Sequence, residues 1–213
     1  MDIHRLIRRR LKVRSLDNLP FSSIRRSRVD LAKLCHEIGY KRGAEVGVCT
    51  GEHSKVLCDN IPGVELYCID LWSEMERRSQ IRQDAFYAET VARLAPYNVH
   101  LMKMSSMAAL SSFEAESLDF VHIDGNHTYD HAAADIIFWS RKLRVGGMMS
   151  VHDYCPAEWF GVVEAVDAYT RSHHIDPWYI IRERQPTAFW IKPPDFTGRD
   201  IRLLQPPSIE LGV

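Results

Sequence analysis

The chain has 213 residues and a mass of 24.6 kDa, which suits one α/β domain with a short extension. A hydrophobic share of 46% is enough for a substantial core, and a formal net charge of −1 gives no overall indication of nucleic-acid or membrane binding. No apolar run approaches the roughly 20 residues of a membrane span, and the N-terminus holds no apolar signal-peptide core. The five cysteines lack CxxC spacing, so we expect free thiols in a cytoplasmic protein.

Basic residues gather in the first part of the chain, which we treat as a basic N-terminal arm over residues 1–28. Residues 1–30 hold nine Lys or Arg and three Asp. One interpretation is an arm that contacts an acidic partner, an anionic substrate or a second subunit of a homo-oligomer. The other is a solvated leader, helical over residues 2–14, because blocks of like charge are commonly solvated.

Helical and strand patterns alternate from residue 28 onward, with Gly39 and Pro96 as helix-ending signals. In chain order we expect a helix (28–39), a strand (43–48), a turn opening a helix (49–61), a strand (64–70), a helix (74–95), a strand (98–104), a helix (105–113), a strand (118–124), a helix (129–143), a strand (148–154), a helix (160–173) and two strands joined by a tight turn (178–184 and 187–193).

Strands that alternate with helices predict βαβ units and a mostly parallel sheet covered on both faces. The fold class is therefore α/β, with a doubly wound seven-stranded sheet that ends in an antiparallel hairpin. Residues 29–192 form this domain, and residues 193–213 form a proline-rich tail expected at the surface.

Ligands of such sheets bind at the carboxyl ends of the strands, so residues at those ends are the site candidates. The first strand runs into "AEVGVCTGEHS", where Gly47 and Gly51 allow a sharp turn and close approach of a ligand. Asp70 ends the second strand, placed either to accept hydrogen bonds from ribose hydroxyls or to cap a helix. Ser105 and Ser106, after the third strand, suit contact with a base or helix capping.

Two further strand ends carry groups that bind metals or move protons. Asp124 ends the fourth strand, with His127 three residues later, and His152 and Asp153 lie near the end of the fifth. Four such groups at neighbouring strand ends either form a site or are polar residues at the junctions of strands and loops.

These segments together resemble a known family. "AEVGVCTGEHS", "YCIDLW", "LMKMSS", "LDFVHIDGNHTYDHAAADIIFW" and "LRVGGMMSVHDY" follow the order and spacing of class I S-adenosylmethionine-dependent methyltransferases. The most similar branch is methyltransferase family 24, and macrocin-type and catechol-type O-methyltransferases are more distant. The resemblance covers residues 29–192 and implies a Rossmann-like fold with S-adenosyl-L-methionine as the cofactor.

The resemblance also implies binding roles. Glu45 and Gly47 would contact the methionine part, Asp70 the ribose and Ser106 the adenine side, while Asp124 would lie between cofactor and acceptor. The full set of implied cofactor contacts is Glu45, Gly47, Val48, Gly51, Asp70, Leu71, Trp72, Ser105, Ser106 and Asp124. Trp72 is also a candidate pocket wall.

In catechol-type relatives, an Asp at the fourth strand end and an Asp-Asn pair at the fifth hold magnesium. Asp124 and Asp153 match the first two ligands, but Tyr154 stands in the third position and is a poor ligand for a hard cation. His127 or His152 could complete the site and would favour a softer divalent ion. The candidate metal set is Asp124, Asp153 and His152.

His127 lies where catechol-type enzymes place a lysine base. An imidazole with a pKa near ~6.5 suits removal of a hydroxyl proton. The alternatives are a hydrogen bond that holds the acceptor, or one that locks the loop to Asp130 or Asp153. The candidate catalytic residues are His127, Asp124 and Asp153.

The expected activity is transfer of a methyl group to a hydroxyl of a small molecule or sugar. One alternative is a nucleoside-binding module without transfer activity. Another is a nucleic-acid methyltransferase that uses the basic arm, although the D/N-P-P-Y/F motif of amino-directed enzymes is absent after the fourth strand.

Overall fold

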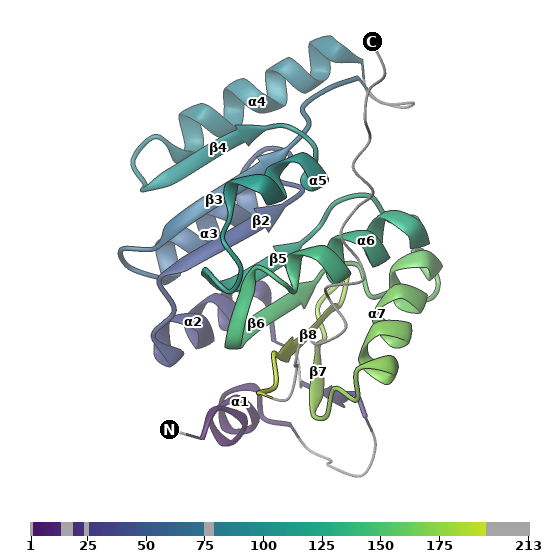
Figure 1. The fold of residues 1–213 in the computed structure, drawn as a ribbon. Coiled ribbons are helices and arrows are strands. Elements are labelled where there is room, and N and C mark those ends of the chain that lie inside the picture. Colours follow the sequence, from purple (N-terminus) through teal and green to yellow (C-terminus); the bar gives the residue numbers. More distant parts are fainter. Residues whose placement is uncertain (1, 14–18, 24–25, 75–78, 195–213) are drawn as a thin grey trace.

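The computed structural model describes residues 2–13, 19–23, 26–74 and 79–194. Its strands are β1 (Phe21–Ser22), β2 (Arg42–Val46), β3 (Glu65–Asp70), β4 (Val99–Lys103), β5 (Leu118–Ile123), β6 (Leu143–Val151), β7 (Trp178–Ile181) and β8 (Thr187–Ile191). Its α-helices are α1 (Ile3–Leu11), α2 (Arg28–Ile38), α3 (Glu52–Asn60), α4 (Gln80–Leu94), α5 (Ser106–Ala109), α6 (Tyr129–Trp139) and α7 (Phe160–Ser172), with a short 3-10 helix at Leu110–Ser112 after α5. Figure 1 shows these elements around one central sheet.

The strands form a single sheet in the order β1-β7-β8-β6-β5-β2-β3-β4. Every neighbouring pair is parallel except β6 with β8 and β7 with β8, because β8 runs against both. In the sheet, β3 and β4 follow β2 on one side, and β5 and β6 follow it on the other side. The strand order therefore reverses between β2 and β5, the position where α/β sheets bind ligands.

The buried side chains form two layers, one on each face of the sheet. Apolar residues of α1, α2, α3 and α4 pack on one face, and those of α5, α6 and α7 pack on the other. This doubly wound α/β arrangement confirms the predicted fold class. The seven predicted strands are β2–β8, and the two-residue β1 is an addition too short to show a periodic pattern.

The N-terminal helix is packed on the domain. Leu6, Ile7 and Leu11 of α1 are buried, while the side chain of Arg10 pairs with Glu37 of α2. The helix predicted over residues 2–14 thus exists over residues 3–11, but its apolar face belongs to the core rather than to a solvated leader. Further along, β1 pairs in parallel with β7 at the sheet edge.

The starts of two predicted segments differ from the structure by five residues or more. The long helix expected over 74–95 begins at Gln80, and residues 75–78 lie outside the described part of the chain. The strand expected over 148–154 starts earlier, at Leu143, and ends at Val151, so His152 and Asp153 lie beyond it. Of the tail, the residues from 195 onward are outside the described part. No helix in the described ranges combines the length and apolar character needed to cross a membrane.

Candidate functional site

The carboxyl ends of four parallel strands lie level with one another. Val46 is paired with Ile123, and Ile123 with Val151. One residue further, the backbone N–H of Asp124 donates to the carbonyl of Val46 at 2.7 Å, and that of His152 donates to the carbonyl of Ile123 at 2.9 Å. The N–H of Gly47 donates to Ile69 of β3 at 2.9 Å. The structure therefore brings the predicted strand-end residues into one row.

Gly47 makes the tightest backbone contact of this row. Its φ is +89°, in the left-handed region that favours glycine, and a Cβ there would lie 2.0 Å from the carbonyl oxygen of Asp124. Because that oxygen belongs to the backbone, it has no side-chain freedom with which to move away. Gly47 is thus required for the close approach of β2 to β5, in addition to the cofactor contact implied by the family.

Asp70 holds the turn that follows Gly47. Its Oδ2 accepts hydrogen bonds from the N–H groups of Val48 at 2.9 Å and Cys49 at 2.8 Å, and its Oδ1 accepts from the N–H of Trp72 at 3.1 Å. The carboxylate stays partly exposed at the strand end. Gly51, with φ +75°, begins α3. Asp70 therefore fixes the glycine turn whether or not a ribose is bound.

Trp72 lies behind this turn. Its side chain is fully buried, packs edge-on against Tyr87, and donates its indole N–H to the carbonyl of Cys49 at 2.8 Å. The structure places it as a support of the turn rather than as an exposed pocket wall. Its neighbour Leu71 is 47% exposed, so a large apolar side chain stands open beside Asp70.

Glu45 is buried beneath the turn, with 1% exposure. The hydroxyl of Ser54 donates to its Oε2, and Nδ1 of His53 lies 3.1 Å from its Oε1. Burial raises the pKa of Glu45 to about 8 and lowers the pKa of His53 to about 3, so both side chains are mostly neutral at pH 7. Glu45 is placed to shape the turn from below.

Ser105 and Ser106 begin α5. The hydroxyl oxygen of Ser105 accepts the N–H of Ala108 at 3.2 Å, which is the helix-capping role. Ser106 points towards α6, where its hydroxyl donates to Asp135 and accepts the indole N–H of Trp139 at 2.7 Å.

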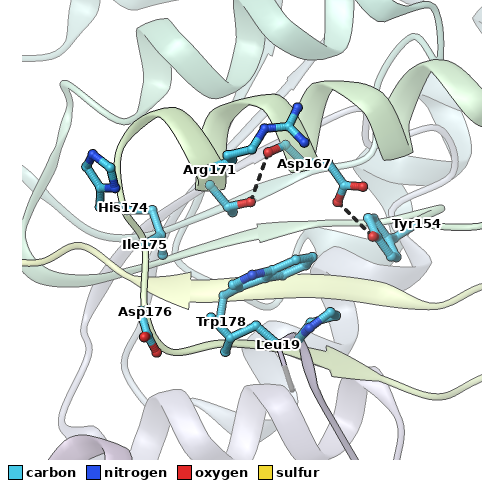
Figure 2. Close-up of a pocket in the computed structure, with 10 residues that line it drawn as sticks. Leu19, Tyr154, Asp167, Arg171, His174, Ile175, Asp176 and Trp178 are labelled. Carbon is cyan, nitrogen blue, oxygen red and sulfur yellow. Dashed lines mark hydrogen bonds between the residues drawn. The ribbon is translucent and has the colours of Figure 1, made fainter. Parts of the chain in front are cut away.

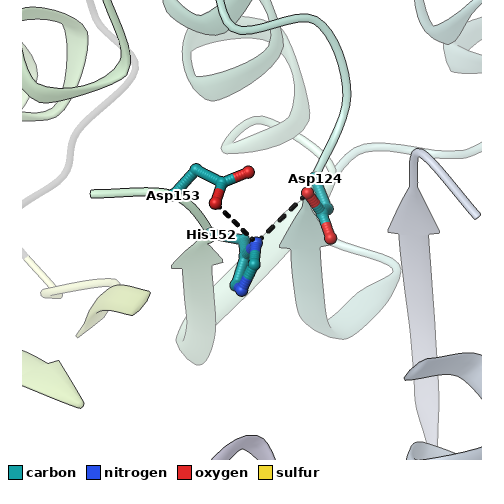
Figure 3. A group of neighbouring side chains, drawn as sticks. All are labelled: Asp124, His152 and Asp153. Atoms are coloured by element: carbon teal, nitrogen blue, oxygen red, sulfur yellow. Dashed lines mark hydrogen bonds and ion pairs between the residues drawn. The ribbon is translucent and has the colours of Figure 1, made fainter. Parts of the chain in front are cut away.

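Asp124, His152 and Asp153 converge at the ends of β5 and β6. In Figure 3 both carboxylates point at one ring nitrogen, Nδ1 of His152, which lies 3.3 Å from Oδ1 of each Asp. One ligand atom from each of the three residues lies within 4.8 Å of the others. Oδ1 of Asp153 is buried and makes no well-aligned hydrogen bond to any described residue. Two carboxylates and an imidazole with an unsatisfied oxygen fit a divalent cation.

His127 joins this cluster from the turn between β5 and α6. Its Nε2 lies 2.8 Å from Oδ2 of Asp153 and 4.0 Å from Asp124, and its ring packs at 4.2 Å on Trp159. The predicted contact with Asp153 is present, and Asp130 is exposed. Burial alone would lower the pKa of His127, but the carboxylates of Asp124 and Asp153 outweigh it and raise the pKa to about 9.

The same balance governs the other charges of the cluster. Burial lowers the pKa of His152, yet both carboxylates together raise it to about 9. Burial would raise the pKa of Asp124 and Asp153, whereas the two imidazoles hold both well below the usual carboxyl range. Without a cation, two imidazolium groups thus neutralise two carboxylates at neutral pH.

Tyr154 turns away from the cluster. Asp153 has φ +59°, and after it the Tyr154 hydroxyl donates to Asp167 of α7 at 2.8 Å. Tyr154 and Trp178 line a cavity of about 580 Å³. Figure 2 shows these two side chains among the residues that line it. The position that corresponds to the third metal ligand of catechol-type enzymes therefore faces another part of the molecule, while His152 lies against Asp124 and Asp153.

Arg28 is a residue of this region that the sequence did not single out. It starts α2, and its guanidinium lies 4.0 Å from Asp124 and 3.7 Å from Glu183. In the sequence it appears only as the last basic residue of the N-terminal arm. Arg28 stands at the start of the helix that precedes β2, and a count of basic residues does not reveal this position.

Substituting Gly47 with Ala should lower stability by at least about 1 kcal/mol more than Gly39→Ala. Gly39 has a similar φ of +94° with nothing within 4 Å of a Cβ, so it carries the backbone strain without the clash. Chemical denaturation of both variants measures the difference. Equal losses would show that the contact with Asp124 does not constrain this turn.

Replacing Glu45 with Gln should remove a pH dependence of stability. The folded carboxyl keeps its proton to about pH 8, while the unfolded one loses it near 4.5. The folded state therefore binds more protons in this window, and wild-type stability relative to Glu45→Gln should fall as pH rises from 5 to 8, by up to about 1.4 kcal/mol per pH unit. Urea denaturation across this range measures it. The exposed Glu52→Gln variant should track the wild type, and parallel curves for all three proteins would contradict the buried-carboxyl assignment.

Comparison with known proteins places this site in context. A family model described as a methyltransferase domain matches residues 44–154, more than half of the chain. The uncharacterized protein y4gI of Sinorhizobium fredii (strain NBRC 101917 / NGR234) is 26% identical over 131 residues, which cover 56% of this chain and 14% of that protein. The chain thus spans a small part of the curated relative's length.

Solved structures share the fold at low identity. Cofactor-bound Rv0187 from MTB has a TM-score of 0.61 and 14% identity, with 78% of this chain and 79% of that chain covered. The O-methyltransferase TomG from Streptomyces achromogenes, in complex with SAM, has a TM-score of 0.56 and 16% identity, with 90% of each chain covered. The matched residues 44–154 include the glycine turn, Asp70, Asp124 and Asp153, and the protein accordingly belongs to the methyltransferase-domain family, the family 24 branch that its motifs resemble.

Proposed function

We propose that the protein is an S-adenosylmethionine-dependent methyltransferase that transfers the methyl group to a hydroxyl of a small molecule or sugar. The observation that carries this proposal is the level row of strand ends, where the glycine turn and Asp70 stand beside Asp124 and His127. This row lies at the point of strand reversal and inside the segment that matches the family.

The cofactor-binding half of the row is β2, β3 and the start of α5. Asp70 would accept hydrogen bonds from the ribose hydroxyls with the lone pairs that the turn leaves free. The exposed Leu71 offers an apolar surface for the base. Gly47, Val48 and Gly51 bring backbone close to the methionine part. Binding of S-adenosylmethionine by TomG supports this assignment by analogy of fold.

The acceptor half of the row is the turn after β5 and the end of β6. In the transfer, the acceptor oxygen attacks the sulfonium methyl carbon, the carbon–sulfur bond breaks, and the electron pair stays on the sulfur of S-adenosylhomocysteine. The proton of the acceptor hydroxyl passes to a base, either water or the deprotonated form of His127. Because the cofactor already carries a reactive methyl group, alignment of oxygen, carbon and sulfur supplies most of what the protein must add.

His127 is the residue proposed to contact the acceptor oxygen. Its Nε2 is held by Asp153, and its ring is held by Trp159. Because the carboxylates of Asp124 and Asp153 keep His127 protonated at neutral pH, its imidazolium suits orientation of the acceptor hydroxyl, and it would accept the hydroxyl proton only in its deprotonated form. Asp153 orients His127 in both cases.

A divalent cation fits the cluster next to His127. Asp124, Asp153 and His152 would hold it, and the mixed oxygen and nitrogen ligands favour an ion such as Mn²⁺ over Mg²⁺. When bound, such an ion would polarise the acceptor oxygen as a Lewis acid.

Isothermal titration with S-adenosylmethionine, followed by a hydroxylated-acceptor screen with and without Mn²⁺, tests the function. We expect micromolar binding of the cofactor and methyl transfer to a hydroxyl. Asp70→Ala should weaken cofactor binding at least about tenfold, because it removes charged hydrogen bonds, while the exposed Asp84→Ala should not. Binding without turnover on any acceptor would favour a nucleoside-binding module instead.

Replacing His127 with Ala should lower kcat about 100-fold or more, the usual contribution of proton transfer and positioning by one side chain, while cofactor affinity stays within about twofold. His131, an exposed histidine of α6, provides the control, and His131→Ala should retain full activity. Steady-state kinetics and titration on both variants measure the two effects. Full activity of His127→Ala would remove this residue from the chemistry.

A further inference from the structure

The guanidinium of Arg28 lies at the row of strand ends with its N–H donors open to a ligand. Its Nη1 lies 4.0 Å from Oδ2 of Asp124, and its Nε lies 3.7 Å from Oε2 of Glu183. Both distances exceed a hydrogen bond, and no other residue in the described ranges accepts one from this group. The Arg28 side chain is 35% exposed. Five N–H donors in a fixed planar fork are therefore within reach of a molecule that enters the site.

The two carboxylates near Arg28 have hydrogen-bonding partners of their own. Glu183 accepts the hydroxyl of Thr187 at 3.1 Å and the backbone N–H of Arg28 at 3.4 Å. Oδ1 of Asp124 lies 3.3 Å from Nδ1 of His152. Long and partly exposed ion pairs such as those of the Arg28 guanidinium contribute little to stability. A structural ion pair therefore does not account for the position of this side chain.

The position of Glu183 places Arg28 on the acceptor side of the site. Glu183 belongs to the turn between β7 and β8, and the N–H of Tyr154 donates to the carbonyl of Pro186 in that turn at 2.9 Å. This hydrogen bond fixes the turn beside the end of β6. Arg28 thus extends from the end of β5 towards β6, whereas Asp70 and the proposed cofactor-binding half lie beyond β2 on the other side.

Asp124 lies between Arg28 and the residue proposed to contact the acceptor hydroxyl. Its Oδ2 is the oxygen near the guanidinium, and its Oδ1 lies 4.0 Å from Nε2 of His127. The side chains of all three residues are partly exposed. A small molecule that spans Asp124 can therefore place a hydroxyl at His127 and a second polar group at Arg28.

We infer that Arg28 binds a carboxylate of the acceptor, so that the protein methylates a hydroxyl of an anionic small molecule in preference to a neutral one. The inference rests on the proposed function, since it names the class of its acceptor. A guanidinium fork matches the two oxygens of one carboxylate and donates two parallel, charge-assisted hydrogen bonds to them. Arg182 and Arg184 flank Glu183 in the same turn and are exposed, so their charge attracts an anion to this edge.

A screen of paired acceptors tests the inference, with each hydroxylated acid beside its carboxamide: dihydroxybenzoate with dihydroxybenzamide, and glucuronate with glucuronamide. The wild type should methylate the acid of a pair with a kcat/KM about tenfold to a hundredfold higher, the range for hydrogen bonds to a charged group. In Arg28→Gln this ratio should fall at least about tenfold, mainly through a higher KM for the acid. Arg28→Lys keeps the charge without the fork and should retain only part of the preference.

Lys33→Gln provides the matched control, because Lys33 is an exposed cation of the same helix and should leave the ratio unchanged. Circular dichroism verifies that the variants are folded, and the wild-type ratio stands as a test if Arg28→Gln is not. Titration with S-adenosylmethionine separates the acceptor from the cofactor, whose methionine part also carries a carboxylate. Cofactor affinity of Arg28→Gln should stay within about twofold of the wild type, since the guanidinium is assigned to the acceptor.

Three results would overturn the inference and leave the proposed function intact. The first is a wild type that methylates the acids no better than the carboxamides. The second is a folded Arg28→Gln with the wild-type ratio. The third is an Arg28→Gln that loses cofactor affinity at an unchanged ratio, which would assign the guanidinium to the cofactor. Absence of methyl transfer to any acceptor, charged or neutral, would overturn the proposed function as well.

Discussion

The contact between the backbone of Gly47 and the carbonyl of Asp124 determines the layout of the whole site. It sets how closely the turn after β2 approaches the end of β5, and both halves of the site extend from these two residues. The glycine turn continues to Asp70 on one side, and Asp124 continues to His127 and His152 on the other. A side chain at position 47 would push the two halves of the site apart. The fold therefore requires glycine at this position, and the glycine also lets a ligand approach the backbone closely.

Charge balance is the second constraint on the site. Asp124 and Asp153 stand against His127 and His152 at the same edge, with Arg28 close by. Groups of this kind are tolerated away from water because each carboxylate has a cationic neighbour. The neutral pair of Glu45 and His53 lies deeper, where the effect of burial on the carboxyl outweighs the attraction of Arg28. The protein therefore keeps charge at the strand ends and neutral polar groups beneath them.

Much of this arrangement follows from the sequence, because strand ends in a parallel sheet meet at one edge. Alternating patterns placed Asp70, Asp124 and Asp153 at that edge, and the structure has them there. The direction of a side chain beyond a strand end does not follow from the sequence pattern, because it depends on the dihedral angles of single residues. Trp72 (φ +39°) and Asp153 (φ +59°) adopt left-handed conformations. These conformations bury the Trp72 ring and send Tyr154 towards Asp167, which no periodic pattern reveals. Asp135 looked like an ordinary helix residue, and its burial depends on how α6 meets α5.

The short strand β1 changes what the sheet presents to other molecules. Strand β7 would otherwise end the sheet with a row of unpaired backbone groups, the kind of edge on which other chains add strands. Phe21 and Ser22 pair with part of that row, and the N–H of Ser23 donates to Ile180. The N-terminal segment that looks like a charged arm in the sequence thus covers part of the edge of the sheet. Resistance to aggregation through this edge therefore depends on residues outside the proposed site.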